Sequence, residues 1–259
     1  MSAASFSAKV AAKQNLAADI CRIDVALNGQ DAAHRPHAGQ FYMLRCWGAG
    51  ETPVLSRPIS VHRWNPDSST IEFLYQVVGE GTEKIAQLKM KDTFQLTGPM
   101  GNGFDVPDIL SKYKKIAVVG GGIGTAPMFQ LTRELAAAGV KPDVFFGFRD
   151  APYCMEEYRE IANLVKVSTD TGAVGFHGFV TQLYDPADYD VVLVCGPTVM
   201  MKNAARLCAE KGTPCFVSME KKMACGIGAC LGCTCETKGG EGKSVCKNGP
   251  VFDATEVFF

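Results

Sequence analysis

The sequence lacks a surplus of charge of either sign, a long apolar segment and any internal repeat. Its 259 residues include 26 Lys and Arg and 27 Asp and Glu, which gives a net charge of −1. Nucleic-acid binding usually needs a basic surplus to neutralise phosphates, so this balance does not support that class. The longest apolar runs, such as VVLV at 191–194, are far too short to span a bilayer, and the N-terminus carries no apolar signal segment. We therefore expect a cytoplasmic protein.

The first hundred residues are rich in short strand patterns that are separated by Gly, Pro, Asn and Asp. One helix is expected over residues 82–89, with Thr82 as its N-cap. The predicted strands cover residues 41–47, 59–64, 71–78 and 92–98. Short strands with a single helix predict a small antiparallel β-barrel, which we assign to residues 1–105.

From about residue 113 the pattern changes to strands that alternate with helices. The predicted strands lie at 114–121, 143–149, 164–170, 190–197 and 215–220, and the predicted helices at 127–139, 154–163 and 198–212. Such alternation is typical of an open parallel sheet. A chain of this length exceeds one average domain. We therefore expect an α/β domain at 106–218 and a small third domain at 219–259.

Five of the eleven cysteines fall within residues 223–250, in the order Cys225-x4-Cys230-x2-Cys233, then twelve residues, then Cys246. An odd number of cysteines in a cytoplasmic protein argues against a disulfide framework. The C-x4-C-x2-C…C spacing is that of plant-type [2Fe–2S] ligation, and the interleaved glycines allow tight turns around the inorganic sulfides. A zinc site is the alternative, although zinc sites more often use paired C-x2-C units. Cys235 is a rival ligand, which we set aside because Cys233 completes the expected spacing.

Four further motifs point to nucleotide cofactors. RPIS (57–60) offers an Arg for a phosphate, although a surface Arg before a rigid Pro would look the same. GEGT (79–82) opens the expected helix, whose free N–H groups suit a pyrophosphate. VVGGGIGTAPM (118–128) carries a strand into a Gly-rich turn and a helix, and VCGP (194–197) ends a second strand. Cys195 would lie beside the occupant of that crevice, or would simply be a core cysteine.

The order of these motifs resembles the ferredoxin-reductase-like flavoproteins with an attached [2Fe–2S] domain. Among these, the sequence is most similar to the electron transfer subunits of NAD-linked dihydroorotate dehydrogenase B. The resemblance spans nearly the whole chain. The stretches that carry it are RPIS, YQVVGEGT, GGGIGTAP, FGFR (146–149), STDTGAVGFHGFVT (168–181), VCGP, MACGIGACLGC and VCKNGPVF (245–252).

The resemblance implies FAD, NAD and a [2Fe–2S] cluster as cofactors, with no catalytic acid or base in this chain. The implied FAD contacts are Arg57, Pro58, Ile59, Ser60, Leu74, Tyr75, Gln76, Gly81 and Thr82. The implied NAD contacts are Gly121, Gly122, Gly124, Thr125, Cys195, Gly196 and Pro197. The implied cluster ligands are Cys225, Cys230, Cys233 and Cys246. Asp150, next to Arg149, would repel a 2′-phosphate and so favours NAD over NADP, and we expect no catalytic role for His177.

The resemblance also implies a partner. A separate FMN-containing subunit would oxidise dihydroorotate in pyrimidine biosynthesis, and electrons would pass through the cluster and FAD to NAD⁺. We expect a heterotetramer with two copies of each subunit, with part of the 223–252 surface at the interface. The alternatives are a standalone NAD(P)H reductase, a reductase subunit of a hydrogenase, sulfide or bifurcating complex, and a redox sensor or zinc-binding module that has kept the fold.

Overall fold

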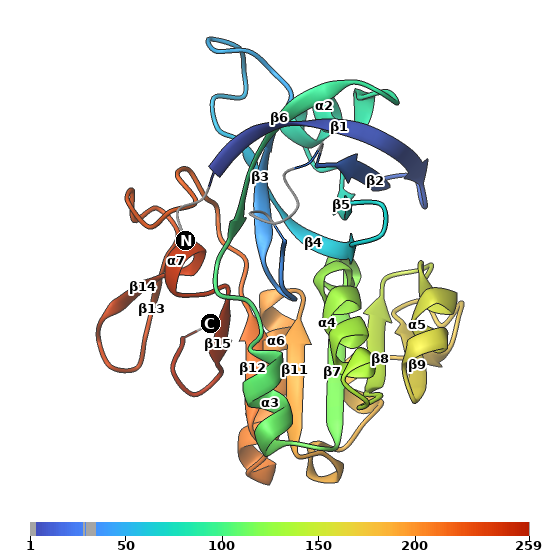
Figure 1. The fold of residues 1–259 in the computed structure, drawn as a ribbon. Helices are drawn as coiled ribbons and strands as arrows, with labels where there is room; N and C mark the ends of the chain where they lie inside the picture. Colours follow the sequence, from blue (N-terminus) through green and yellow to red (C-terminus); the bar gives the residue numbers. More distant parts are fainter. Residues whose placement is uncertain (1–3, 28, 30–34, 259) are drawn as a thin grey trace.

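The computed structural model describes residues 4–27, 29 and 35–258, and its N-terminal part is a closed six-stranded barrel (Figure 1). The strands follow one another around the barrel in the order β1-β2-β5-β4-β3-β6, and all neighbours are antiparallel. They are β1 (Ala4–Asn15), β2 (Ile20–Ala26), β3 (Phe41–Arg45), β4 (Arg57–Asn65), β5 (Thr70–Gln76) and β6 (Thr93–Met100). The predicted barrel is confirmed. The first two strands were not singled out from the sequence, because β1 presents small Ala and Ser side chains and gives a weak apolar alternation.

The helix that crosses one end of the barrel is α2 (Glu80–Gln87), and it begins earlier than the sequence predicted. Gly79 is its N-cap, so the prediction of Thr82 as N-cap is wrong. The Thr82 hydroxyl donates to Gly79 O at 2.8 Å and accepts from Val78 N at 3.0 Å. A threonine at the third helical position can therefore reach back and bind the same backbone groups that an N-cap side chain would serve.

The second half of the chain forms a seven-stranded sheet in the order β10-β9-β8-β7-β11-β12-β15. All neighbours are parallel except β12 and β15, which are antiparallel. The strands are β7 (Ile116–Gly121), β8 (Asp143–Phe148), β9 (Leu164–Thr169), β10 (Phe176–His177), β11 (Val191–Cys195), β12 (Cys215–Ser218) and β15 (Val251–Asp253). Every residue of β7 and β11 is buried, as expected for central strands that are covered on both faces.

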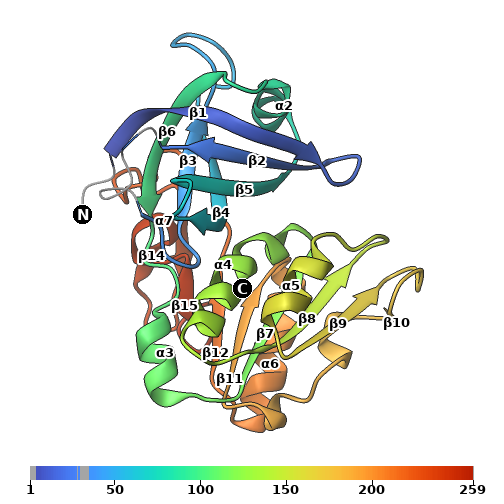
Figure 2. The same cartoon turned by 45° about the vertical axis from the view of Figure 1, so that its right-hand side comes forward.

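Helices cover both faces of this sheet (Figures 1 and 2). On one face, α3 (Val106–Lys112), α4 (Ala126–Ala137) and α5 (Met155–Ile161) bury their apolar residues in one shared core. On the other face, α6 (Thr198–Lys211) shares a core with the C-terminal segment. Three short 3₁₀ turns complete this part, η1 (Gly122–Thr125), η2 (Val180–Gln182) and η3 (Pro186–Asp188). None of the helices in the described part of the chain is long and apolar enough to span a bilayer.

The C-terminal region, which is red in Figure 1, lies against the sheet and the barrel. It contains a small hairpin, β13 (Thr234–Glu236) and β14 (Gly242–Ser244), then α7 (Val245–Asn248) and β15. Residues 219–233 form neither helix nor strand. Val245 and Phe252 are buried in the same core as Val119 and Val194 of the central strands. The domain boundaries near 105 and 218 stay predictions, and β15 returns across the second of them to pair with β12.

Candidate cofactor sites

A cavity of about 350 Å³ opens where the barrel meets the sheet. Of the predicted flavin contacts, all but Gly81 line it, and they come from β4, β5 and α2. The sheet side contributes Ile123, Ala126 and Pro127 from the Gly-rich turn and α4, and Cys195 from the end of β11. The cavity therefore brings together the motifs of both halves of the chain.

The cationic end of this cavity is built around Arg57. A Cβ atom on Gly81 would contact Arg57 Nε, so the guanidinium rests directly on the start of α2. Arg57 Nη1 also donates to Leu55 O at 2.6 Å. A fixed guanidinium beside free helix N–H groups suits a phosphate group. Gly81 thus belongs to this site by supporting Arg57, although it does not line the cavity.

Much of the rest of the cavity lining is apolar. Ile59 and Leu74 on the barrel side face Ala126 and Pro127 on the sheet side of the same cavity. Ser60 provides a hydroxyl at its edge. An apolar slot with a cation at one end fits a flat ring system that is joined to a phosphate. The residues present therefore fit FAD, with an isoleucine in place of an aromatic stacking partner.

Sequence reasoning missed part of the wall. Phe41 and Pro250 line the cavity, as do Met219, Glu220, Lys221 and Met223 from the segment after β12. A signal for the second group was available, because ligands of open α/β sheets bind beyond the carboxyl ends of the strands. Residues 219–223 follow the end of β12 directly.

The two turns that are predicted to bind NAD touch each other backbone to backbone. A Cβ atom on Gly124 would lie 2.5 Å from Gly196 Cα, and one on Gly121 would lie 2.4 Å from Met200 Sδ. Gly122, with φ +53°, has no atom within 4 Å of where its Cβ would lie. Of the predicted NAD contacts, only Cys195 lines the cavity. The turns are thus in place beside the flavin slot, and their NAD contacts stay a prediction.

Burial raises the pKa of the Cys195 thiol well above its usual value. The side chain is 1% exposed and belongs to the core of the sheet as well as to the cavity wall. A neutral thiol at this position is a compact apolar surface, not a nucleophile. The two interpretations that the sequence left open for Cys195 are therefore compatible.

The four predicted cluster ligands lie in and beside a loop that wraps tightly. Gly226, Gly228 and Leu231 have φ between +59° and +79°, which is the left-handed region. Each of the four sulfurs accepts a backbone N–H: Gly228 N to Cys246 at 3.1 Å, Cys230 N to Cys225 at 3.4 Å, Cys246 N to Cys233 at 3.4 Å and Gly232 N to Cys230 at 3.5 Å. The thiols pair as Cys225 with Cys230 and Cys233 with Cys246, and N–H donors aimed at all four sulfurs fit an iron–sulfur cluster.

The same N–H groups act on the charge of the thiols. Burial raises the pKa of Cys225, but the backbone N–H groups of Cys230 and Ile227 outweigh it and lower the pKa to about 6. Burial and the neighbouring Cys233 thiol raise the pKa of Cys246 to about 12. A thiol must be deprotonated to bind a metal, so a cation held here would favour the ionised form of Cys246.

Cys235 is engaged elsewhere. It lies in β13, is 3% exposed, and its Sγ donates to Lys243 O on the facing strand at 3.3 Å. This hydrogen bond to the hairpin supports the exclusion of Cys235 from the ligand set.

Known proteins are similar to this chain both in its C-terminal region and over most of its length. Residues 220–258 match the family described as the iron–sulfur cluster binding domain of dihydroorotate dehydrogenase B. The chain is 47% identical over 219 residues to the dihydroorotate dehydrogenase B (NAD(+)) electron transfer subunit of Clostridium acetobutylicum, which covers 85% of each chain. The chain belongs to the family of dihydroorotate dehydrogenase B electron transfer subunits. The corresponding protein of Caldanaerobacter subterraneus subsp. tengcongensis is 37% identical over 257 residues, covering 97% of this chain and 98% of that protein.

Solved structures show which proteins share the fold of this chain. A structure of an NADH-dependent reduced ferredoxin-NADP oxidoreductase, described in the context of flavin-based electron bifurcation, superposes with a TM-score of 0.85 at 28% identity, over 97% of this chain and 89% of that one. The ferredoxin reductase of a carbazole 1,9a-dioxygenase gives a TM-score of 0.66 at 20% identity, over 82% and 67% of the two chains, which supports the fold alone. The predicted fold class and the predicted family are both confirmed.

Proposed function

We propose that this chain carries electrons from the catalytic subunit of a dihydroorotate dehydrogenase to NAD⁺, through a [2Fe–2S] cluster and FAD. The observation that carries the proposal is the short link between the two candidate sites. Met223 lines the cavity and Cys225 is a candidate ligand, so one residue separates them in the chain. A Cβ atom on Gly226 would lie 2.6 Å from Met100 Sδ of the barrel strand β6, so the loop rests on the barrel wall.

The chemistry belongs to the groups that the chain holds: a cluster exchanges single electrons, a nicotinamide exchanges a hydride, and a flavin converts between the two. The residues of the chain bind and orient these groups. Arg57 holds the phosphates, Ile59 and Leu74 hold the ring, and the backbone N–H groups of the cysteine loop stabilise the negative charge on the sulfurs. No side chain of the cavity is needed as an acid or a base toward dihydroorotate.

We propose that the partner is an FMN-containing catalytic subunit in an assembly with two copies of each chain. The face that suits it lies over the cysteine loop. Ile227 is 56% exposed and Leu231 is 65% exposed, and Cys230 is exposed between them. Exposed large apolar side chains beside a redox centre fit a protein interface, because electron transfer requires that the partner approach closely.

A second candidate is the reductase subunit of an electron-bifurcating complex. It is favoured by the similarity, at 28% identity over almost the whole chain, to the structure described in that context. The two candidates share the cofactor sites and differ in the partner, so an activity measured with the native partner separates them.

The deciding experiment is anaerobic reduction of NAD⁺ by dihydroorotate, followed as NADH absorbance, with the chain purified together with its partner. We expect activity in the complex and none in this chain alone. If the complex shows no dihydroorotate-dependent activity while NADH still reduces the bound flavin, the reductase role stands and the dihydroorotate partner is wrong.

A further inference from the structure

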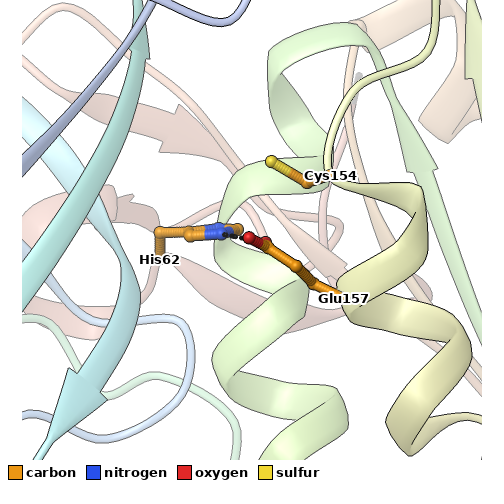
Figure 3. Close-up of side chains that lie close together, drawn as sticks. All are labelled: His62, Cys154 and Glu157. Carbon is orange, nitrogen blue, oxygen red and sulfur yellow. Dashed lines mark ion pairs between the residues drawn. The ribbon is translucent and has the colours of Figure 1, made fainter. Parts of the chain in front are cut away.

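The junction between the barrel and the sheet contains a partly buried group of charged side chains that the cofactor sites do not use. At its centre is His62 of β4, whose side chain is 0% exposed. The His62 ring stacks on Phe129 of α4 with 4.8 Å between the ring centres. Figure 3 shows His62 reaching from the barrel toward Glu157 on α5, with Cys154 at the start of that helix. This group therefore joins elements that lie far apart in the sequence.

The charges in this group balance across the junction. Glu157 lies 2.7 Å from Arg22, 3.4 Å from Arg63 and 4.0 Å from His62 Nε2. Glu72 of β5 lies 3.2 Å from His62 Nε2 and 4.0 Å from both arginines. The His62 ring, followed by the Arg22 guanidinium, holds the pKa of Glu157 at about 2. Glu157, which comes from the sheet side, is thus ionised and lies beside three basic groups of the barrel.

A metal ion is a competing occupant of this place. One ligand atom each from His62, Cys154 and Glu157 lies within 4.8 Å of the others. However, Arg22 and Arg63 already supply positive charge to both carboxylates. Burial raises the pKa of the Cys154 thiol to about 12, so it stays protonated. The geometry therefore favours an ion-pair network over a cation site.

The network is connected directly to the wall of the flavin cavity. His62 Nδ1 lies 2.7 Å from the carbonyl oxygen of Ala126, and Ala126 lines the cavity. Because a carbonyl can only accept, Nδ1 carries the hydrogen of this bond. The Tyr158 hydroxyl donates to the preceding carbonyl, that of Thr125, at 2.6 Å. Two successive carbonyls at the end of the Gly-rich turn are therefore held by buried side chains, one from each domain.

We infer that His62 is a positioning residue for hydride transfer: its bond to Ala126 O sets how closely the nicotinamide side of the cavity faces the flavin side. This inference rests on the proposed function. The width of the cavity depends on the angle between the barrel and the sheet. His62 ties the barrel to the Gly-rich turn through its bond to Ala126 O, and Glu72 lies 3.2 Å from the other ring nitrogen. Small errors in the distance between reacting atoms cost large factors in rate.

The test replaces His62 with side chains that keep different parts of the ring. In His62→Asn the amide nitrogen lies where Nδ1 lies, so the bond to Ala126 O is kept. In His62→Gln the amide lies near the Nε2 position and the bond is lost, and in His62→Phe only the stacking on Phe129 remains. Arg133→Met is the matched control, because Arg133 Nη1 donates across the same junction to Trp64 O at 2.8 Å and its side chain does not line the cavity.

The measurement is rapid anaerobic reduction of the bound flavin by NADH in the holoprotein, which gives a limiting rate and an apparent Kd. Reduction by dithionite, which needs no nicotinamide geometry, and the Tm are measured beside it. We expect the limiting rate to fall about tenfold or more in His62→Gln and His62→Phe, with Kd and dithionite reduction little changed. His62→Asn should restore the rate to within about twofold of wild type, whereas Arg133→Met should lower the Tm and keep the rate.

The inference is overturned if His62→Gln and His62→Phe lower only the Tm, or if His62→Asn loses as much rate as His62→Gln. A wild-type flavin that NADH does not reduce would contradict the proposed function itself, and the positioning role with it. If NADH reduces the wild-type flavin and the limiting rate is the same in the His62 variants, only the positioning role is contradicted.

Discussion

The cysteine loop and the barrel–sheet junction are both places where distant residues must meet, and they are held together in different ways. Residues 219–233 have no helix or strand, and Cys230 is exposed. Two of its N–H to sulfur bonds lie within the loop, and two more join it to Cys246 in α7. The junction is held by buried rings and charges that come from β2, β4, β5, α4 and α5.

The two regions owe their order to different interactions. A loop whose bonds are made to thiolates is ordered by whatever the thiolates hold, because metal binding and folding are coupled. A junction of stacked rings and paired charges is ordered by packing, whether or not a ligand is present. The four predictions below test this difference, and they begin with the change that should matter most.

The largest effect is expected from Cys230→Ser. Loss of one of four thiolate ligands should remove or strongly weaken the cluster, since a serine hydroxyl is a poor ligand for iron at neutral pH. Iron and acid-labile sulfide per chain, measured after anaerobic purification, should fall to a small fraction of wild type, while the flavin content stays. Cys235→Ser is the control and should keep its iron, because that thiol is bonded to Lys243 O. Full iron in Cys230→Ser would remove Cys230 from the ligand set.

The same difference explains how much of the molecule the sequence predicts. The cysteine spacing predicts the cluster site directly, because every ligand and every turn glycine lies within a short stretch of chain. The strand and helix alternation predicts the sheet, and RPIS with GEGT predicts the barrel side of the flavin cavity, because these are local patterns too.

What the sequence does not predict depends on contacts between distant segments. Nothing near His62 in the chain announces that it will meet Glu157, which lies in another domain. The cavity wall at residues 219–223 depends on the path that the chain takes after β12. The strand β15 forms only because residues near the C-terminus pair with β12. The start of α2 was misplaced because Thr82 reaches back from the third helical position, which looks like a cap in the sequence.

The second prediction concerns how tightly the cavity between the barrel and the sheet binds FAD. Arg57→Ala removes the cation that rests on Gly81 at the phosphate end of the cavity. Loss of a charge-assisted bond of about 1.5–3 kcal/mol should raise the Kd for FAD about 10- to 100-fold. Flavin release during gel filtration, or titration of the flavin-free protein by fluorescence, gives this number. Arg45→Ala is a control at the same end of the barrel, because Arg45 bonds to loop carbonyls and does not line the cavity. Unchanged FAD affinity in Arg57→Ala would contradict the phosphate role.

The third prediction concerns the contact between the two turns that are predicted to bind NAD, which also depends on packing. In Gly124→Ala the new Cβ would lie 2.5 Å from Gly196 Cα and 2.7 Å from Cys195 O, which are backbone atoms that cannot rotate away. Overpacking of this kind should cost about 1–3 kcal/mol and lower the Tm by several degrees. Gly122→Ala is the matched control, since its Cβ would meet nothing within 4 Å and its cost is limited to the left-handed φ of +53°. Iron content should stay at the wild-type level in both variants. If Gly124→Ala is as stable as wild type, the two turns are not packed tightly against each other.

The smallest effect is expected at the exposed end of β8, where a charge acts without packing around it. Arg149 and Asp150 lie 3.6 Å apart, and their side chains are 90% and 61% exposed. In Asp150→Asn the repulsion of a 2′-phosphate is removed, but water screens a charge at this exposure to about 1 kcal/mol. The ratio of kcat/KM for NADPH to that for NADH should therefore rise only a few-fold, with the NADH value nearly constant. The steady-state flavin reductase activity of the holoprotein with each nucleotide gives this ratio. A hundredfold change in this ratio would contradict the expectation, because it would mean that Asp150 becomes buried against the nucleotide when the nucleotide binds.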